Sequence, residues 1–308
     1  MNKKISIVIP VYSNSGSLPD LFKELILLEK KLKKIKLNME LIFVDDGSPD
    51  DSYKILKQFK KTRPNSKLIK LTRNFGAIHA SKCGFKFVTG NCFTLLAADL
   101  QDPPVLIFEM AKKWLAGSKF VIYERVTRDD PLTSKFFASI YYKLLHKLVI
   151  SDYPKNGYDL GLMDEFFLPY LVNSSKTLHT PILAYWLGFK PEVLYYHRRE
   201  RIHGLSGWTF TKKVKAFFNI MFGFSTKPIR VISFFGLSVS TLSFFYGSFV
   251  VINAFLGNIP IPGYASIISL VSFLLSLILL MLVIISEYIW HISDELNKRP
   301  EYVIEEMS

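Results

Sequence analysis

Polar side chains directly follow an apolar run between Phe93 and Pro104, where the sequence reads FTLLAADLQDPP. A run of this length, closed by turn residues and two prolines, is typical of a buried parallel strand whose carboxyl end reaches a ligand crevice. Asp99 and Gln101 are two positions apart, so in continued strand geometry both side chains would face one side and could bind one divalent cation through oxygen. Asp102 precedes Pro103 and is expected to be an N-cap.

Other apolar runs in the first half of the chain also end in polar residues, which are Pro10 and Tyr12, then Asp45, Asp46 and Ser48, then Arg73 and Asn74. Neither a P-loop nor a Gly-x-Gly-x-x-Gly sequence follows the first strand, so a bound diphosphate would need another counter-charge. Carboxylates that hold Mg²⁺ or Mn²⁺ provide one, because the metal bridges phosphate oxygens that carboxylates alone would repel. Taken alone, the Asp45 to Ser48 segment could also be a strand-to-helix turn with a cap.

The elements that must position these residues alternate in type along the chain. Apolar runs predict strands at 5–12, 41–44, 67–71, 91–98 and 119–123, and apolar residues at helical spacing predict helices at 18–35, about 51–61, 77–88 and 103–116. Regular alternation of strand and helix predicts an α/β fold with a Rossmann-like, mainly parallel sheet.

The C-terminal third differs in composition from the rest of the chain, because no Asp, Glu, Lys or Arg occurs between Val231 and Ser286. Two transmembrane helices are predicted there, at about 231–256 and 264–286, and each is long enough to cross a hydrocarbon layer of ~30 Å. A hairpin buried in a soluble core is the alternative, but both segments are apolar on every face.

Basic residues flank the two predicted spans, and the turn between them carries no charge. The flanking residues are Lys212, Lys213, Lys215, Lys227 and Arg230 before the first span, and Lys298 and Arg299 after the second. By the positive-inside rule both flanks are cytoplasmic. We therefore expect a cytoplasmic catalytic domain (1–207), an amphipathic juxtamembrane segment (208–230), the transmembrane helices (231–290) and a cytoplasmic tail (291–308).

The formal net charge of +13 would suit nucleic acid, but no nucleic-acid-binding motif occurs, and an anionic membrane surface explains the charge. The only cysteines are Cys83 and Cys92, which argues against a disulfide framework or a zinc site.

Four motifs occur in the order and spacing of the GT-A glycosyltransferases of family 2: IVIPVYSN, VDDGSPDDS, LTRNFG and ADLQDPP. Within this family the chain resembles the bacterial polyprenyl-phosphate glycosyltransferases, which are similar to dolichol-phosphate mannose synthase and the bactoprenol glucosyltransferases. This more specific resemblance rests on four further segments: YDLGLMD, RERIHGLSGW, FSTKPIR and EYIWHISDELNKRPEY. The resemblance covers nearly the whole chain.

The resemblance implies a role for each matching residue. It implies nucleotide-sugar binding by Pro10, Tyr12, Asp45, Asp46, Asn74, Ala98 and Ser206, metal binding by Asp99 and Gln101, and acceptor-phosphate contacts by Arg125 and Arg128. It implies catalytic roles for Asp99 and, through sugar or phosphate contacts, for Asp159, Arg199 and Arg201. Each of these arginines could instead be a solvated or membrane-surface charge. Asp159 could be a base or could only orient the substrate.

Several positions depart from the family pattern, among them Ala97, Gly161, Gly207 and Ala77. Family members commonly have Asp at the position of Ala97, so this chain has a smaller set of metal-binding carboxylates, and Gly161 stands where related glucosyltransferases have Arg. These differences affect the expected donor sugar and diphosphate contacts more than the fold.

The resemblance implies an inverting transferase that is dependent on Mg²⁺ or Mn²⁺ and moves a sugar from a nucleotide sugar, expected to be a UDP-sugar, to undecaprenyl phosphate. Its place would be the cytoplasmic face of the bacterial inner membrane, as a multi-pass protein with both termini cytoplasmic, in a pathway of cell-surface glycan, cell-wall or O-antigen modification. The transmembrane helices offer a surface for self-association into a homo-oligomer. The alternatives are a transferase with a glycan hydroxyl acceptor and a degenerate scaffold that binds nucleotide sugar without turnover.

Overall fold

The computed structural model describes residues 3–126, 143, 145–147, 150–154, 157–174, 180–197 and 199, scattered positions from 220 to 256, and then residues 263–297 and 299–308. The chain divides into two compact units. One contains Met1–Phe217 together with Pro300–Ser308, and the other is Phe218–Arg299. Each unit is described by itself.

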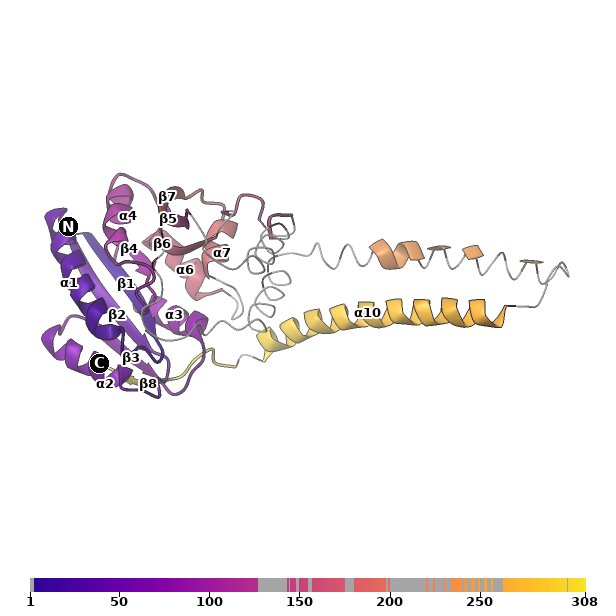
Figure 1. Ribbon diagram of the computed structural model, residues 1–308, viewed down its shortest axis with the longest axis horizontal. Coiled ribbons are helices and arrows are strands. Elements are labelled where there is room, and N and C mark those ends of the chain that lie inside the picture. The colour runs from indigo at the N-terminus through magenta and orange to yellow at the C-terminus, as the bar shows by residue number, and fades with distance from the viewer. Residues whose placement is uncertain are drawn as a thin grey trace. The chain divides into compact units, whose positions relative to one another are not determined.

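The first unit is built on an eight-stranded sheet with the order β7-β5-β6-β4-β1-β2-β3-β8 (Figure 1). The strands are β1 (Lys3–Val11), β2 (Leu37–Asp45), β3 (Lys67–Leu71), β4 (Cys92–Leu95), β5 (Phe120–Arg125), β6 (Tyr158–Asp164), β7 (Glu192–Tyr196) and β8 (Ile304–Met307). The adjacent strands β4, β1, β2 and β3 are parallel, as the sequence predicts. The sheet as a whole is mixed, because β6 is antiparallel to both β4 and β5, and β8 is antiparallel to β3.

The predicted helices of the first half are confirmed as α1 (Leu18–Lys34), α2 (Ser52–Thr62), α3 (Ala77–Phe85) and α4 (Leu106–Leu115). Side chains alternate between the two faces of a strand. Ile5, Ile7 and Ile9 of β1 belong to the core that contains the buried leucines of α1, whereas a Cβ atom on Gly84 of α3 would lie 2.3 Å from Val8 Cγ1. Helices α1 and α3 therefore cover opposite faces of β1 (Figure 1).

Three short helical elements accompany the second half of the sheet, namely η1 (Glu165–Phe167), α6 (Leu168–Val172) and α7 (Thr180–Trp186). Packing explains why residue 161 of β6 is glycine, because a Cβ atom at this position would lie 2.9 Å from the ring of Tyr158. That ring is buried, and its hydroxyl donates a hydrogen bond of 2.8 Å to the carbonyl oxygen of Pro181.

The second unit contains α10 (Tyr264–Leu296), a helix of 33 residues. Among the described residues one helical stretch, Phe273–Trp290, is long and apolar enough to cross a membrane. The second predicted span, 264–286, lies within α10. The first predicted span, 231–256, and the juxtamembrane segment, 208–230, fall largely outside the described residues.

The end of the chain belongs to the sheet of the first unit. Residues 291–308, which are predicted to form a cytoplasmic tail, include strand β8 (Ile304–Met307), which adds to the edge at β3. The chain thus returns to the α/β unit after α10.

Candidate active site

The carboxyl ends of β1 and β2 and the loop after β4 lie next to one another, because these strands are parallel neighbours. Pro10 is in register with Val44, and Val11 is in register with Asp45. On the other side of β1, the backbone N–H of Leu96 donates a hydrogen bond of 2.9 Å to the carbonyl oxygen of Val8. Three of the predicted polar segments therefore meet at one edge of the sheet, as expected.

Asp45 ends β2 and is fully buried. Its Oδ2 atom accepts a hydrogen bond of 3.2 Å from the backbone N–H of Ser48, whereas its Oδ1 atom is buried and has no hydrogen-bond partner among the described residues. Burial raises the pKa of this carboxyl group, and the hydrogen bonds from Ser48 offset the rise only in part. A buried acceptor without a partner is costly, so Oδ1 is suited to an N–H donor from a ligand.

Asp46 has a different role from its neighbour. Its two carboxylate oxygens each accept a hydrogen bond of 2.8 Å, Oδ1 from the backbone N–H of Phe75 and Oδ2 from that of Gly76. Burial raises the pKa of Asp46, and these two hydrogen bonds oppose the rise. Asp46 therefore holds the loop before α3, whereas the prediction treats both aspartates alike as lining the pocket.

The same loop packs tightly against the end of β2. Gly47 has a φ of +65°, and a Cβ atom there would lie 2.6 Å from the backbone carbon of Arg73. Asn74 is exposed in this loop. Tyr12, after β1, is 45% exposed, and its backbone N–H donates a hydrogen bond of 3.0 Å to Asn14 Oδ1. Both side chains are thus open to a ligand at the sheet edge.

The loop after β4 departs from the predicted strand geometry. Strand β4 ends at Leu95 instead of Ala98, and Leu100 has a φ of +61°. This left-handed residue reverses the chain between Asp99 and Gln101, and Asp99 Oδ1 accepts a hydrogen bond of 3.2 Å from the Gln101 backbone N–H. The premise that Asp99 and Gln101 lie on one face of a strand is therefore wrong, although the turn still keeps the two residues together.

Asp102 is not the N-cap of the next helix. Helix α4 begins at Leu106, with Val105 as its N-cap residue. The buried carboxylate of Asp102 instead accepts a hydrogen bond from the hydroxyl group of Tyr196, the last residue of β7. The proline pair explains the shift, because Pro103 and Pro104 form a separate turn in which the Leu106 N–H binds the Pro103 carbonyl oxygen at 3.0 Å.

Contacts from two other elements hold the loop after β4. Ala98 is buried, and its carbonyl oxygen accepts a hydrogen bond of 2.7 Å from Ser17 Oγ, just before α1. The backbone N–H of Arg199 donates a hydrogen bond of 3.1 Å to the Gln101 carbonyl oxygen. The guanidinium group of Arg199 lies 2.6 Å from Glu24 Oε1 of α1. The backbone of Arg199 therefore lies beside the Asp99 loop, whereas its side chain pairs with α1, and its active-site role stays a prediction.

The remaining predicted residues are placed less completely. Arg125 is the last residue of β5, and the backbone of Asp159 lies in β6. The side chain of Asp159 and the residues Arg128, Arg201 and Ser206 lie outside the described part of the chain.

The loop after β4 contains hard oxygen donors that could bind a divalent cation. Within the described residues, no group of three or more His, Cys, Asp and Glu side chains converges on a point. Asp99 and Gln101 could supply one carboxylate and one amide oxygen, which are ligands that Mg²⁺ and Mn²⁺ accept. The other ligands would have to come from the diphosphate and water.

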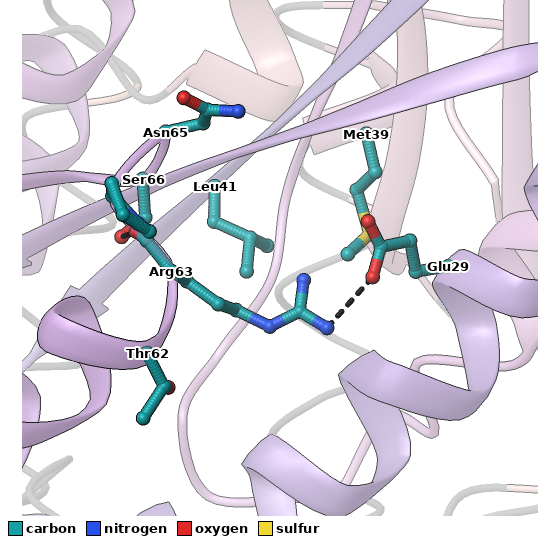
Figure 2. Close-up of a pocket in the computed structure, with 8 residues that line it drawn as sticks. Glu29, Met39, Leu41, Thr62, Arg63, Asn65 and Ser66 are labelled. Atoms are coloured by element: carbon teal, nitrogen blue, oxygen red, sulfur yellow. Dashed lines mark hydrogen bonds and ion pairs between the residues drawn. The ribbon is translucent and has the colours of Figure 1, made fainter.

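A separate pocket lies near the start of β2 and is lined by Met39, Leu41, Glu29 and Arg63, among others (Figure 2). Arg63 Nη2 and Glu29 Oε2 form an ion pair of 2.7 Å across it. Because the polar residues of the candidate active site follow the other end of β2, this pocket is not that site.

Sequence reasoning missed two buried contacts, namely the hydrogen bond between Tyr196 and Asp102 and the ion pair between Lys82 and Glu301. No local sequence pattern marks either of them. An alternation of apolar and polar residues indicates burial but does not name the partner across the fold.

Known proteins resemble this chain along its whole length. It is 31% identical to an uncharacterized glycosyltransferase of Synechocystis, over 100% of this chain and 96% of the relative. It is 29% identical to the SfII prophage-derived bactoprenol glucosyl transferase of Shigella flexneri, over 98% of this chain and 97% of the relative.

Among solved structures, TarS 1–349 of S. aureus matches 63% of this chain at 15% identity, with a TM-score of 0.42, and this chain covers 60% of it. The family model described as glycosyl transferase family 2 matches residues 6–175, which include the ends of β1, β2 and β3, the Asp99 loop and β6. The chain therefore belongs to glycosyl transferase family 2.

Proposed function

We propose that the protein transfers a sugar from a nucleotide-sugar donor to polyprenyl phosphate at the cytoplasmic face of a membrane, with inversion at the anomeric carbon. Family membership supports glycosyl transfer. The observation that carries the donor part is the buried Oδ1 atom of Asp45, which has no hydrogen-bond partner within the described residues and lies at the same sheet edge as the loop after β4. The acceptor part is supported by full-length similarity to a bactoprenol glucosyl transferase.

Asp45 is suited to the base of the nucleotide. A uracil ring carries one N–H group flanked by two carbonyl groups, and that N–H would supply the donor that Oδ1 lacks. Tyr12 follows Val11, which is in register with Asp45, and its exposed side chain offers a ring face for stacking. A UDP-sugar is therefore the donor that we propose.

The diphosphate would lie toward the loop after β4. Asp99 and Gln101 would hold Mg²⁺ or Mn²⁺ there, and the metal would supply positive charge to the leaving nucleoside diphosphate. Arg199 lies beside this loop and, with the predicted Arg201, would add further positive charge near the phosphates. Asp159 would contact the sugar.

The chemistry of the acceptor determines what the residues must do. A hydroxyl acceptor loses a proton as it attacks, so it needs a positioned base. A phosphate monoester has a second pKa of ~6 and is largely a dianion at neutral pH. Arg125 and Arg128 would therefore hold this phosphate in line with the anomeric carbon, and attack from the opposite face would invert the centre.

A membrane location fits the lipid acceptor. Phe273–Trp290 of α10 is long and apolar enough to span a bilayer, and the uncharged stretch from Val231 to Ser286 has room for a second span. We propose two transmembrane helices that form a hairpin, with cytoplasmic termini and a surface for self-association.

The function is tested with purified full-length protein, a panel of labelled nucleotide sugars, and polyprenyl phosphate, polyprenol or an oligosaccharide as the acceptor. A labelled lipid that forms from polyprenyl phosphate alone, and that disappears on addition of a chelator, is the expected result. Transfer to polyprenol or to an oligosaccharide would favour the hydroxyl-acceptor alternative. Donor binding without transfer across the whole panel would favour the scaffold.

A further inference from the structure

The last residues of the chain complete the edge of the sheet next to the candidate donor site. Strand β8 is antiparallel to β3, and Leu68 and Ser308 exchange two backbone hydrogen bonds of 2.9 Å. At the other end of the segment, the Thr72 N–H donates a hydrogen bond of 3.0 Å to the Val303 carbonyl oxygen. Thr72 begins the loop that leads to Phe75 and Gly76, so the C-terminal segment reaches the base of this loop.

An ion pair joins the partly buried Glu301 of this segment to the buried Lys82 of α3. The side chain of Lys82 is only 2% exposed, and its Nζ atom lies 2.9 Å from Glu301 Oε1 and 2.8 Å from Glu301 Oε2. The same ammonium group donates a hydrogen bond of 2.7 Å to the carbonyl oxygen of Ser174. A buried ammonium group needs a counter-charge. Here that charge comes from a residue 219 positions away in the sequence.

Helix α3 also carries the loop that Asp46 holds. Gly76 is the N-cap residue of α3, and the Ala80 N–H donates a hydrogen bond of 3.1 Å to its carbonyl oxygen. Gly76 and the preceding Phe75 are the donors to Asp46. His79, in the first turn, has its Nδ1 atom 3.8 Å from Glu301 Oε2. Glu301 therefore faces the same short helix whose amino end forms one wall of the candidate donor site.

The packing of α3 leaves little room for independent movement of its two ends. Gly84, near its carboxyl end, lies so close to β1 and β2 that a Cβ atom would contact the side chains of Val8 and Val44. Close-packed protein interiors transmit strain, so we infer that a shift at Lys82 is passed along this short helix. The ion pair that fixes Lys82 would therefore also fix Gly76 at the amino end of α3.

We propose that Glu301 is a positioning residue of the donor site, which acts through Lys82 and α3 to keep the Phe75–Gly76 loop on Asp46. This inference rests on the proposed nucleotide-sugar function. It means that residues which follow the membrane helix in the sequence complete the donor site. The catalytic part of the chain is then fully assembled only after the C-terminal segment has returned to it.

The test uses the full-length protein in detergent and compares Glu301→Gln with Glu306→Gln. Glu306 is a matched control, because it lies on β8 in the same segment but pairs with the exposed Lys57 of α2 at 2.8 Å. For Glu301→Gln we expect the Kd for UDP with Mn²⁺, measured by calorimetry, and the KM for the donor to rise about tenfold. The KM for polyprenyl phosphate should stay unchanged, and Glu306→Gln should match the wild type in all three measurements.

Hydrogen exchange at the amides of Phe75 and Gly76 reports on the loop directly, without catalysis. We expect faster exchange in Glu301→Gln than in Glu306→Gln. Equal exchange rates and equal UDP affinities in the two variants would overturn the inference. If the wild type binds no nucleoside diphosphate, the proposed function fails, and the exchange rates alone then decide whether Glu301 holds the loop.

Glu301→Gln leaves a buried ammonium group without its counter-charge, so the variant could unfold. The double variant Lys82→Met/Glu301→Leu removes both charges and should therefore retain the fold. It also removes the link to α3, so we expect its UDP affinity to remain about tenfold weaker than that of the wild type. Wild-type affinity in a folded double variant would overturn the inference.

Discussion

The backbone N–H of Gly76 donates a hydrogen bond of 2.8 Å to Asp46 Oδ2, and this bond ties the amino end of α3 to the end of β2. Asp45, the preceding residue, leaves one buried oxygen without a partner in the described part of the chain. The two adjacent aspartates thus differ: Asp46 shapes the loop, and we propose that Asp45 accepts a hydrogen bond from the ligand.

Substitution of each aspartate by asparagine should distinguish the structural role of Asp46 from the proposed binding role of Asp45. Asn has one acceptor oxygen, so Asp46→Asn can bind only one of the two backbone N–H groups and should lower the free energy of unfolding by about 1–3 kcal/mol. Asp45→Asn should leave stability near that of the wild type and weaken UDP binding about tenfold or more. Urea unfolding and calorimetry measure the two effects. An equal loss of stability in both variants would contradict this division of roles.

Gly47 should not tolerate a side chain. An added Cβ atom would lie 2.6 Å from the backbone of Arg73, and the φ of +65° disfavours any L side chain. Gly47→Ala should therefore displace the loop and cost about 2–4 kcal/mol of stability. Gly117→Ala is the control, because Gly117 has a φ of +114° but no neighbour within 4 Å. It should cost only the backbone strain, about 1 kcal/mol. Similar thermal unfolding of the two variants would show that the close contact with Arg73 is unimportant.

Asp99→Asn should remove metal-stimulated transfer and leave the fold intact, because the amide keeps the size of the side chain but loses its charge. We expect a fall in kcat of about 100-fold or more. Metal titrations of turnover, with circular dichroism for the fold, provide the measurement. Undiminished activity would rule out Asp99 as a metal ligand.

Ala97→Asp restores the carboxylate that family members commonly have two residues before Asp99. We expect tighter binding of Mn²⁺, because a second hard oxygen donor joins the first. The metal concentration for half-maximal activity should fall. If this concentration and the donor affinity are unchanged, the smaller carboxylate set of this chain has no consequence for metal binding.

Glu40 should make the fold sensitive to acid. Its buried carboxylate accepts hydrogen bonds from Ser6 Oγ at 2.5 Å and Thr89 Oγ1 at 2.8 Å, and lies 3.0 Å from Lys67 Nζ. Burial alone would raise the pKa of Glu40, but the hydrogen bonds from Ser6, Thr89 and Lys67 hold it below the usual 4.5.

A lowered pKa in the folded state means that Glu40 stabilises the fold above the usual pKa and loses this effect as the pH falls through the folded-state value. The Tm of the wild type should therefore fall steeply as the pH drops below about 4.5, and the Tm of Glu40→Gln should fall less steeply. Glu109→Gln is a control, since this carboxylate lies on the surface of α4 and pairs with Lys112 at 3.0 Å. If the Tm of Glu40→Gln changes with pH as steeply as that of the wild type, the prediction is wrong.

Much of the α/β unit was predictable because its signals are local. The apolar runs that became β1, β2 and β3 and the helical spacing of leucines in α1 specify these elements within a few residues. Since parallel strands share one carboxyl edge, the sequence also predicts that Asp45, Asp46 and the Asp99 segment meet there.

The sequence by itself determined the family, the order of strands and helices in its first half, and the sheet edge where polar residues gather, because motifs and periodicity are properties of neighbouring residues. Only the tertiary structure decided that Leu100 turns the chain in a left-handed conformation, that Asp102 binds Tyr196 instead of capping α4, and that Glu301 neutralises Lys82. These outcomes depend on packing between distant segments. No local pattern encodes which buried side chain will lie opposite another once the sheet has formed.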